Sequence, residues 1–254
     1  MNTKKYGDLN VDICDSASDL GSRAASDFAK NVTEELKNKS EISIILATGN
    51  SQLPFINAIR SQPGVDWSKI SVFHMDEYIG MAKTHSASFV RWMEERVVAE
   101  LKPKNFFGIQ GDAADVSNEV QRYSDLLAKH EPSICVMGIG ENGHVAFNDP
   151  PADFETKDLV KIIKLDDLAC RLQQVNEGHF PSLDSVPESA ITLTVHALLK
   201  PNKVMVLTPE MRKAKAVKGA LEGPITPSCP ASILRTAPNA HLYLDLDSSS
   251  LLNS

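Results

Sequence analysis

Short runs of apolar residues alternate along the chain with longer segments in which apolar residues recur every three or four positions. The short runs are typical of buried strands, and the longer periodicity is typical of amphipathic helices. We therefore predict strands at residues 42–46, 70–73, 134–138, 191–194, 204–207 and 241–244. We predict helices at residues 16–38, 53–61, 87–102, 117–130 and 210–222.

This alternation predicts an α/β fold of three layers, in which helices cover both faces of a mostly parallel, Rossmann-like sheet. The length suits one domain, residues 1–254. Residues 150–186 break the alternation, because they begin with two prolines and contain one β-rich stretch at 159–165. We predict that this segment is a lid insertion over the sheet, and that the serine-rich tail, residues 248–254, frays.

Composition and charge exclude several classes of protein. The chain has 26 lysines and arginines against 33 aspartates and glutamates, a net charge of −7, which argues against a nucleic-acid or membrane-surface partner. No apolar run reaches the length of about 18–20 residues that a transmembrane helix needs. The four cysteines are scattered, no His/Cys cluster has metal-ligand spacing, and the N-terminal residues lack the apolar stretch of a signal peptide. We therefore expect a cytoplasmic protein without a metal site.

Three predicted strands end in polar or glycine-rich segments, and ligands of parallel sheets bind beyond the C-terminal ends of strands. The first segment, Thr48-Gly49-Asn50-Ser51, leads from a strand into a helix. Its hydroxyl and amide groups lie beside the free N–H groups of a helix start, an arrangement that suits phosphate. The alternative is an ordinary turn with a helix cap.

The second segment places two adjacent carboxylates, Asp76 and Glu77, directly after a strand. A carboxylate at the ligand edge of the sheet can act as a base that moves a proton between neighbouring carbons. Two anions in a partly desolvated site also raise at least one of the two pKa values. The alternative is a solvated acidic turn.

The third segment begins at Gly138 and contains two further glycines, Gly140 and Gly143, which let the backbone approach a ligand closely. His144 can exchange protons near neutral pH, and Asp149 is placed to orient it. This combination predicts a catalytic histidine in a loop at the sheet edge.

In their order and spacing, the three segments resemble the glucosamine-6-phosphate deaminase/isomerase family, whose fold is shared with 6-phosphogluconolactonases. The resemblance covers about residues 10–245. The sequence Met75-Asp76-Glu77-Tyr78 is similar to the deaminase signature, and residues 142–150 resemble the family's NGH…FNEP element. Residues 186–193 and 212–214 also fit the family pattern.

The resemblance implies a cofactor-independent enzyme that isomerises and deaminates glucosamine 6-phosphate to fructose 6-phosphate and ammonia. Asp76 would move a proton between C2 and C1 of the open-chain sugar, and His144 would assist ring opening. Asn142 and Asp149 would hold the imidazole of His144, and Lys213 would contact the phosphate. The remaining residues implied in substrate or phosphate binding are Thr48, Gly49, Asn50, Ser51 and Gly138.

The chain departs from the family pattern at three positions. Asn142 stands where some members carry Asp, and Asp149 replaces the commoner Glu. His179 precedes a phenylalanine where the family has a phosphate-binding arginine, and Arg171 or Gln173 could replace that arginine. Many family members are oligomers, so the resemblance allows a homo-oligomer, although the sequence identifies no interface.

Two alternative functions share the fold. A 6-phosphogluconolactonase is disfavoured because it needs no carbon proton carrier, which would leave Asp76 without a task, and because its glycine-histidine loop has another sequence. A sugar-phosphate-sensing domain of a transcription regulator would need a DNA-binding segment, and the first 40 residues contain no basic helix-turn-helix pattern. The site residues, rather than the fold, separate these functions.

Overall fold

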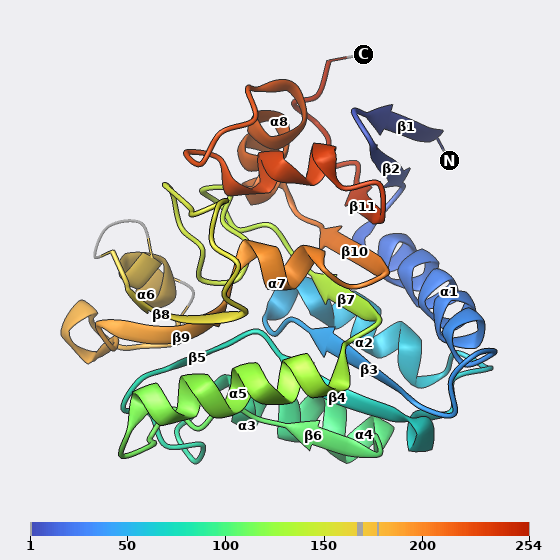
Figure 1. Ribbon diagram of the computed structural model, residues 1–254. Helices are drawn as coiled ribbons and strands as arrows, with labels where there is room; N and C mark the ends of the chain where they lie inside the picture. Colours follow the sequence, from blue (N-terminus) through green and yellow to red (C-terminus); the bar gives the residue numbers. More distant parts are fainter. Residues whose placement is uncertain (1, 167–169, 177, 254) are drawn as a thin grey trace.

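The computed structural model describes residues 2–166, 170–176 and 178–253, and it confirms a three-layer α/β fold (Figure 1). The main sheet has eight strands in the order β1-β2-β11-β10-β7-β3-β4-β6. All neighbours in this sheet are parallel except β1 and β2. The strands are β1 (Asn2–Tyr6), β2 (Leu9–Cys14), β3 (Ile42–Leu46), β4 (Ile70–His74), β6 (Asn105–Phe107), β7 (Ile134–Met137), β10 (Lys203–Thr208) and β11 (Ala240–Asp245).

Helices cover both faces of this sheet because its central strands are apolar on both sides. On β3, Ile44 and Leu46 pack with one helical layer, whereas Ile45 packs with the other. The first layer contains α1 (Ala17–Glu35), α2 (Leu53–Arg60), α3 (Phe89–Met93), a π-helical turn (Glu94–Val98) and α4 (Ala99–Leu101). The second layer contains α5 (Val116–His130), α7 (Val195–Leu199) and α8 (Ala214–Glu222).

A second, three-stranded antiparallel sheet lies beside the main one (Figure 1). Its order is β5-β9-β8, with β5 at Asp76–Tyr78, β9 at Ser189–Leu193 and β8 at Val160–Lys164. The β-rich stretch predicted at 159–165 is therefore confirmed as β8, but the strand predicted at 191–194 belongs to this small sheet and not to the main one. The small sheet and the short helix α6 (Leu172–Asn176) share an apolar core of their own.

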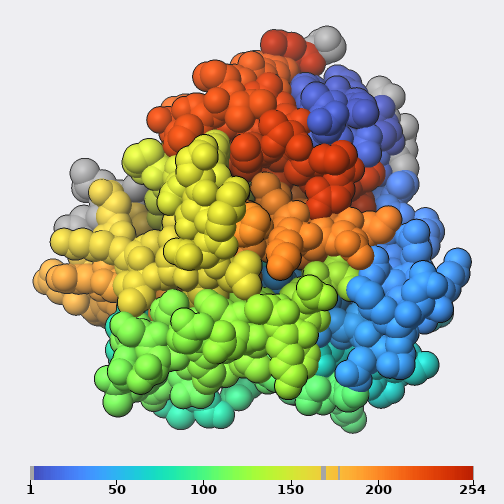
Figure 2. All heavy atoms as spheres, in the orientation of Figure 1, coloured from blue at the N-terminus to red at the C-terminus, as the bar shows by residue number. Residues whose placement is uncertain are grey.

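The segment 150–186 packs against the rest of the chain. Its strand β8 contacts α5, and in Figure 2 the yellow surface of this segment lies directly against the green surface of the α5 region. The described residues of the segment thus form a flank of the molecule, and its role as a lid stays a prediction.

The structure differs from the sequence prediction at both chain ends. The hairpin β1–β2 was not predicted, because the polar residues of edge strand β1 carry no apolar periodicity. The tail was expected to fray, but Ser248 is fully buried and its backbone N–H donates to Asp245. Asn253 donates to Glu222 through both backbone and side chain, so residues 248–253 form a hydrogen-bonded turn against α8.

We predict that Gly21→Ala destabilises the protein although alanine is the better helix former. A Cβ atom at Gly21 would lie 2.4 Å from the backbone carbon of Pro54, where α1 crosses α2. The overlap should cost about 1–3 kcal/mol, more than the gain of about 1 kcal/mol from helix propensity. Urea unfolding measures the difference. Gly219→Ala in α8 is the control, because a Cβ there would make an ordinary contact of 3.6 Å with Cys229, and it should not destabilise. Equal stability of the two variants would contradict the prediction.

Candidate active site

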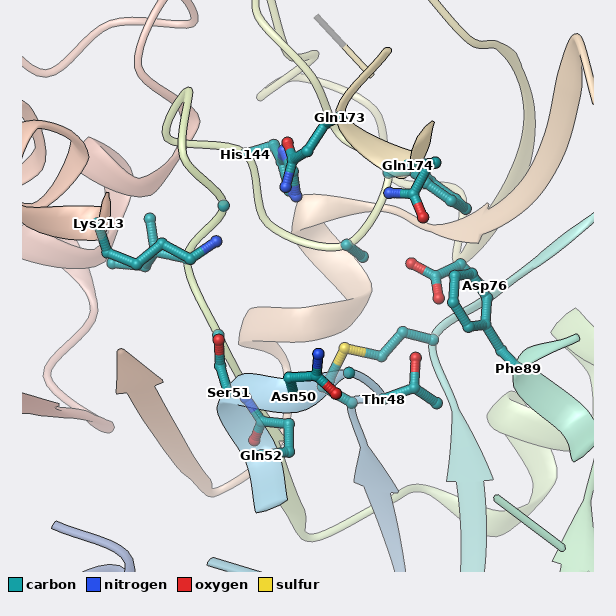
Figure 3. A pocket seen from close by; sticks show the side chains of 18 of the residues that line it. Thr48, Asn50, Ser51, Gln52, Asp76, Phe89, His144, Gln173, Gln174 and Lys213 are labelled. Carbon is teal, nitrogen blue, oxygen red and sulfur yellow. The ribbon is translucent and has the colours of Figure 1, made fainter. Parts of the chain in front are cut away.

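A cavity lies at the C-terminal ends of β3, β4, β7 and β10 (Figure 3). It opens where the chain reverses its direction across the sheet. Strand β3 pairs with β4 on one side and with β7 on the other, and the later strands β10 and β11 continue from β7. Such a topological switch point is where open α/β sheets bind ligands.

The loop after β3 forms one wall of the cavity. Thr48, Gly49, Asn50 and Ser51 all line it, and their role in binding phosphate stays a prediction. Gly49 has a φ of 99°, which favours glycine, and a short 3-10 helix (Asn50–Gln52) then leads into α2. This wall therefore presents hydroxyl, amide and backbone N–H groups beside a helix start.

Two cations line the cavity opposite this loop. Lys213 is only 5% exposed, and Figure 3 shows its ammonium group pointing into the cavity from the side opposite Asp76. Arg212 forms ion pairs with Glu141 at 2.9 Å and Glu210 at 2.5 Å. Both cations stand on a 3-10 turn (Met211–Lys213) that precedes α8. Because two carboxylates pair with Arg212, Lys213 is the cation at this end that can meet an anionic ligand.

Asp76 is the first residue of β5, and its carboxylate faces the cavity at 9% exposure of the residue. Burial, together with the neighbouring Glu77 carboxylate, raises the pKa of Asp76 from 3.8 to about 8. A hydrogen bond from the Phe147 backbone opposes this shift. Asp76 can therefore exchange a proton near neutral pH, as a general base requires.

Glu77 has a structural role instead. Its carboxylate accepts hydrogen bonds from the Ser88 hydroxyl at 2.7 Å and from the Val90 backbone at 2.9 Å, at the start of α3. Burial raises the pKa of Glu77, and these hydrogen bonds oppose that shift. These two hydrogen bonds therefore hold the start of α3, which places the Phe89 ring on the cavity wall.

His144 lines the cavity, and its Nδ1 atom contacts Asn142 and Asp149, the two residues expected to hold the imidazole. Nδ1 of His144 lies 2.8 Å from Oδ1 of Asn142 and 3.3 Å from Oδ1 of Asp149. Asn142 also donates to Asp149 at 2.8 Å. Burial alone would raise the pKa of Asp149, but the hydrogen bond and charge of His144 hold it below its ordinary value. Because both partners of Nδ1 are acceptors, Nδ1 carries the proton and Nε2 is left for a ligand.

The glycines of this loop make room for the imidazole. Gly138 lines the cavity, and a Cβ atom there would lie 3.0 Å from the Gln52 side chain. The ring of His144 rests on Gly140, where a Cβ would lie 2.1–2.4 Å from three ring atoms.

Arg171 does not take the place predicted for it. Its guanidinium donates to the carbonyl oxygens of Val186 at 2.8 Å and Leu183 at 2.9 Å, and it is not among the described residues that line the cavity. These carbonyls hold the buried side chain within the insertion. Gln173, the other possible replacement for the family's arginine, lines the cavity. His179, which stands at the position of that arginine, lines it as well.

Sequence reasoning missed several residues of the cavity wall. Gln52, Phe89, Gln174 and Arg212 line it but had no predicted role in the site. Gln52 and Arg212 adjoin predicted motifs, so their position in the sequence could have indicated that they lie at the cavity. Phe89 and Gln174 come from segments that only the fold brings to the sheet edge.

Among residues 2–166, 170–176 and 178–253, no group of three or more His, Cys, Asp or Glu side chains could hold a metal ion. Within the same residues, no helix is both long enough and apolar enough to cross a membrane.

Comparison with known proteins identifies similar sequences. The profile of the family described as glucosamine-6-phosphate isomerases/6-phosphogluconolactonase matches residues 15–243. The glucosamine-6-phosphate deaminase of Lactobacillus delbrueckii subsp. bulgaricus is 30% identical over 244 residues, 96% of this chain and 100% of the relative. The glucosamine-6-phosphate deaminase of Exiguobacterium sibiricum is 32% identical over 220 residues, 87% of this chain and 85% of the relative.

Solved structures share the fold. One described as a monomeric glucosamine-6-phosphate deaminase superposes with a TM-score of 0.85 at 27% identity, covering 95% of this chain and 99% of the relative. A 6-phosphogluconolactonase from Shewanella baltica superposes with a TM-score of 0.74 at 17% identity, covering 92% of this chain and 97% of that one. At this lower identity the similarity extends to the fold alone.

We predict that Asp76→Asn becomes more stable relative to the wild type as the pH rises from about 4 to about 8. The measured quantity is the unfolding free energy of the variant minus that of the wild type. Because the pKa of Asp76 is raised from 3.8 to about 8, the folded wild type binds a proton in this range that the unfolded chain releases. The wild type therefore loses stability with rising pH, by at most about 1.4 kcal/mol per pH unit, and the asparagine variant does not.

Urea unfolding of the ligand-free protein across this pH range measures the difference. Asp66→Asn is the control, because the exposed Asp66 has a lowered pKa and gives no such increase above pH 4. A difference that stays constant from pH 4 to pH 8 would exclude a raised pKa at Asp76.

Proposed function

Because the chain belongs to the family of glucosamine-6-phosphate isomerases and 6-phosphogluconolactonases, we propose that it converts glucosamine 6-phosphate and water to fructose 6-phosphate and ammonia. The observation that carries this proposal is the buried carboxylate of Asp76, in the same cavity as an oriented imidazole. Deamination by isomerisation needs both groups: a proton carrier for carbon and a proton carrier for oxygen.

The first step opens the sugar ring. Nε2 of His144 takes the proton of the anomeric hydroxyl and returns it to the ring oxygen, and the C1 aldehyde forms. The contacts of Nδ1 with Asn142 and Asp149 support this role, because they fix the tautomer that has a free Nε2. The Asp149 carboxylate also stabilises the imidazolium that exists while the proton is in transit.

The second step moves a proton between carbons. The aldehyde acidifies the C2 hydrogen, which the ionised Asp76 carboxylate removes. The C1 oxygen takes a proton that the C2 ammonium group gives up, and an enolamine remains between C1 and C2. Asp76 returns the proton to C1, and the C2 amine becomes an imine. Water adds to the imine carbon, ammonia leaves, and the C2 ketone of fructose 6-phosphate remains. A base with a pKa of about 8 suits this task, since it is strong enough to accept a carbon-bound proton and ionises near neutral pH.

The phosphate binds between the loop after β3 and the cationic turn before α8. Ser51 and its neighbours offer a hydroxyl and backbone N–H groups, and Lys213 supplies a nearly buried ammonium group. This end lies across the cavity from Asp76 (Figure 3), so an extended sugar phosphate reaches both.

The alternative function is hydrolysis of the lactone that the family's 6-phosphogluconolactonases act on. Lactone hydrolysis would leave Asp76 without a carbon proton to carry, and the relatives that are at least 30% identical over most of the chain are named as deaminases. Assembly into a homo-oligomer and a cytoplasmic location stay predictions; one structural relative is described as monomeric.

The test of the function is ammonia release from glucosamine 6-phosphate by the wild type and by Asp76→Asn. Asparagine keeps the size of the side chain but cannot accept a carbon-bound proton, so we expect a loss of about 10⁴-fold or more in kcat. Hydrolysis of 6-phosphogluconolactone is measured in parallel. Near-normal ammonia release by Asp76→Asn would remove the assignment of the base. Rapid lactone hydrolysis, with no ammonia from the wild type, would overturn the function.

Lys213→Ala should weaken substrate binding and raise KM more than it lowers kcat, because the phosphate contact is equal in the ground and transition states. The matched control is Lys215→Ala, since Lys215 is exposed on α8 and is not among the described residues that line the cavity. Steady-state kinetics at low salt measure both variants. If Lys213→Ala behaves like Lys215→Ala, the phosphate site lies elsewhere.

A further inference from the structure

Gln174 is a polar residue of the cavity that the proposed reaction does not use. It stands on α6, it is 9% exposed, and it lines the cavity. Figure 3 shows its side-chain amide and the Asp76 carboxylate pointing toward each other. The side-chain amide of Gln174 has no hydrogen-bond partner among residues 2–166, 170–176 and 178–253. Its amide atoms are not among the buried polar atoms that lack a partner, so they stay accessible from the cavity that the residue lines. A ligand in the cavity can therefore form hydrogen bonds with this amide.

The surroundings of Gln174 restrict which part of the substrate it can meet. Its neighbour Asp76 works on C2, so the amino nitrogen, one bond from C2, must lie beside the Asp76 carboxylate. Met75 and Phe89 give the cavity apolar lining, and Figure 3 shows the Thr48 hydroxyl on the same side of the cavity as Asp76. His144 serves the C1 hydroxyl and the ring oxygen, and Lys213 stands at the phosphate end of the cavity. The Gln174 amide is therefore available to the amino group from the side of the cavity that Asp76 faces.

We propose that the side-chain oxygen of Gln174 accepts a hydrogen bond from the C2 amino group and makes the site select 2-amino over 2-hydroxy sugar phosphates. This inference rests on the proposed function. A protonated amino group donates a charge-assisted hydrogen bond to the amide oxygen, whereas a C2 hydroxyl donates only a neutral one, which is weaker. The same ammonium group lies against Asp76, so Gln174 holds it where it also favours the ionised carboxylate.

The experiment compares two reduced, open-chain inhibitors, 2-amino-2-deoxyglucitol 6-phosphate and glucitol 6-phosphate. They differ only at C2, so the ratio of their inhibition constants isolates the contribution of the amino group. Gln174→Met keeps the length of the side chain and removes its polar atoms. We expect this variant to lower affinity for the amino compound by about 10- to 100-fold and to lower affinity for glucitol 6-phosphate less, so that the preference for the amino compound falls. Gln174→Glu restores an acceptor oxygen and should restore the preference.

Gln173→Met is the matched control, because it removes the same amide one position along α6. In Figure 3 the Gln173 side chain points toward His144 and not toward Asp76. Its ratio of inhibition constants should remain that of the wild type. An unchanged ratio in Gln174→Met, an equal change in both variants, or an equal loss of affinity for both inhibitors would overturn the assignment.

Ammonia release by the wild type separates the two proposals. An enzyme that releases ammonia and keeps its inhibitor preference in Gln174→Met refutes only the role of Gln174. A wild type that releases no ammonia from glucosamine 6-phosphate refutes the function on which that role rests.

Discussion

The site depends on how a short strand separates two adjacent carboxylates. Successive side chains of a strand point to opposite faces, so Asp76 faces the cavity while Glu77 faces the start of α3. There Glu77 is satisfied by Ser88 and by the backbone of Val90. Because its hydrogen bonds are made elsewhere, Glu77 affects Asp76 through its charge, which adds to the effect of burial and raises the pKa of Asp76. One carboxylate thereby holds a helix start, and the other is exposed to the cavity, where we propose that it transfers a proton.

Both sheets contribute residues to the cavity. The main sheet ends in the loops that carry Ser51 and His144, whereas Asp76 belongs to β5, which pairs with β9 in the small sheet. The backbone N–H of Phe147 in the histidine loop donates to Thr192 of β9, so the two units are joined beside the site. In the proposed reaction, the main sheet would hold the phosphate end of the substrate, and the small sheet would supply the base.

Much of this arrangement could be predicted from the sequence, because its strands are strongly apolar and its loops contain chemically distinctive residues. Asp76, His144 and the loop at residues 48–51 all reach one cavity, since parallel strands bring their C-terminal ends together. Arg171 could not be placed, because its partners are backbone carbonyls, which no side-chain pattern reveals. Gln174 and Phe89 were missed for a related reason: tertiary packing brings them to the cavity wall, and their local sequence is ordinary. The edge strand β1 was missed because it has little apolar surface to bury.

The contact between Gly140 and the ring of His144 has a consequence for how this chain can vary. A side chain at position 140 would occupy the volume of the imidazole itself, with a Cβ only 2.1 Å from the ring. Gly49, by contrast, faces open space and is constrained by its backbone angle alone. With a φ of 99° and a ψ of 168°, however, Gly49 lies in a backbone region that is essentially restricted to glycine. In a mutational library, both positions should therefore admit glycine only, position 140 because of the ring contact and position 49 because of its backbone angles. The same restriction at two glycines of one cavity would thus have two separate physical causes.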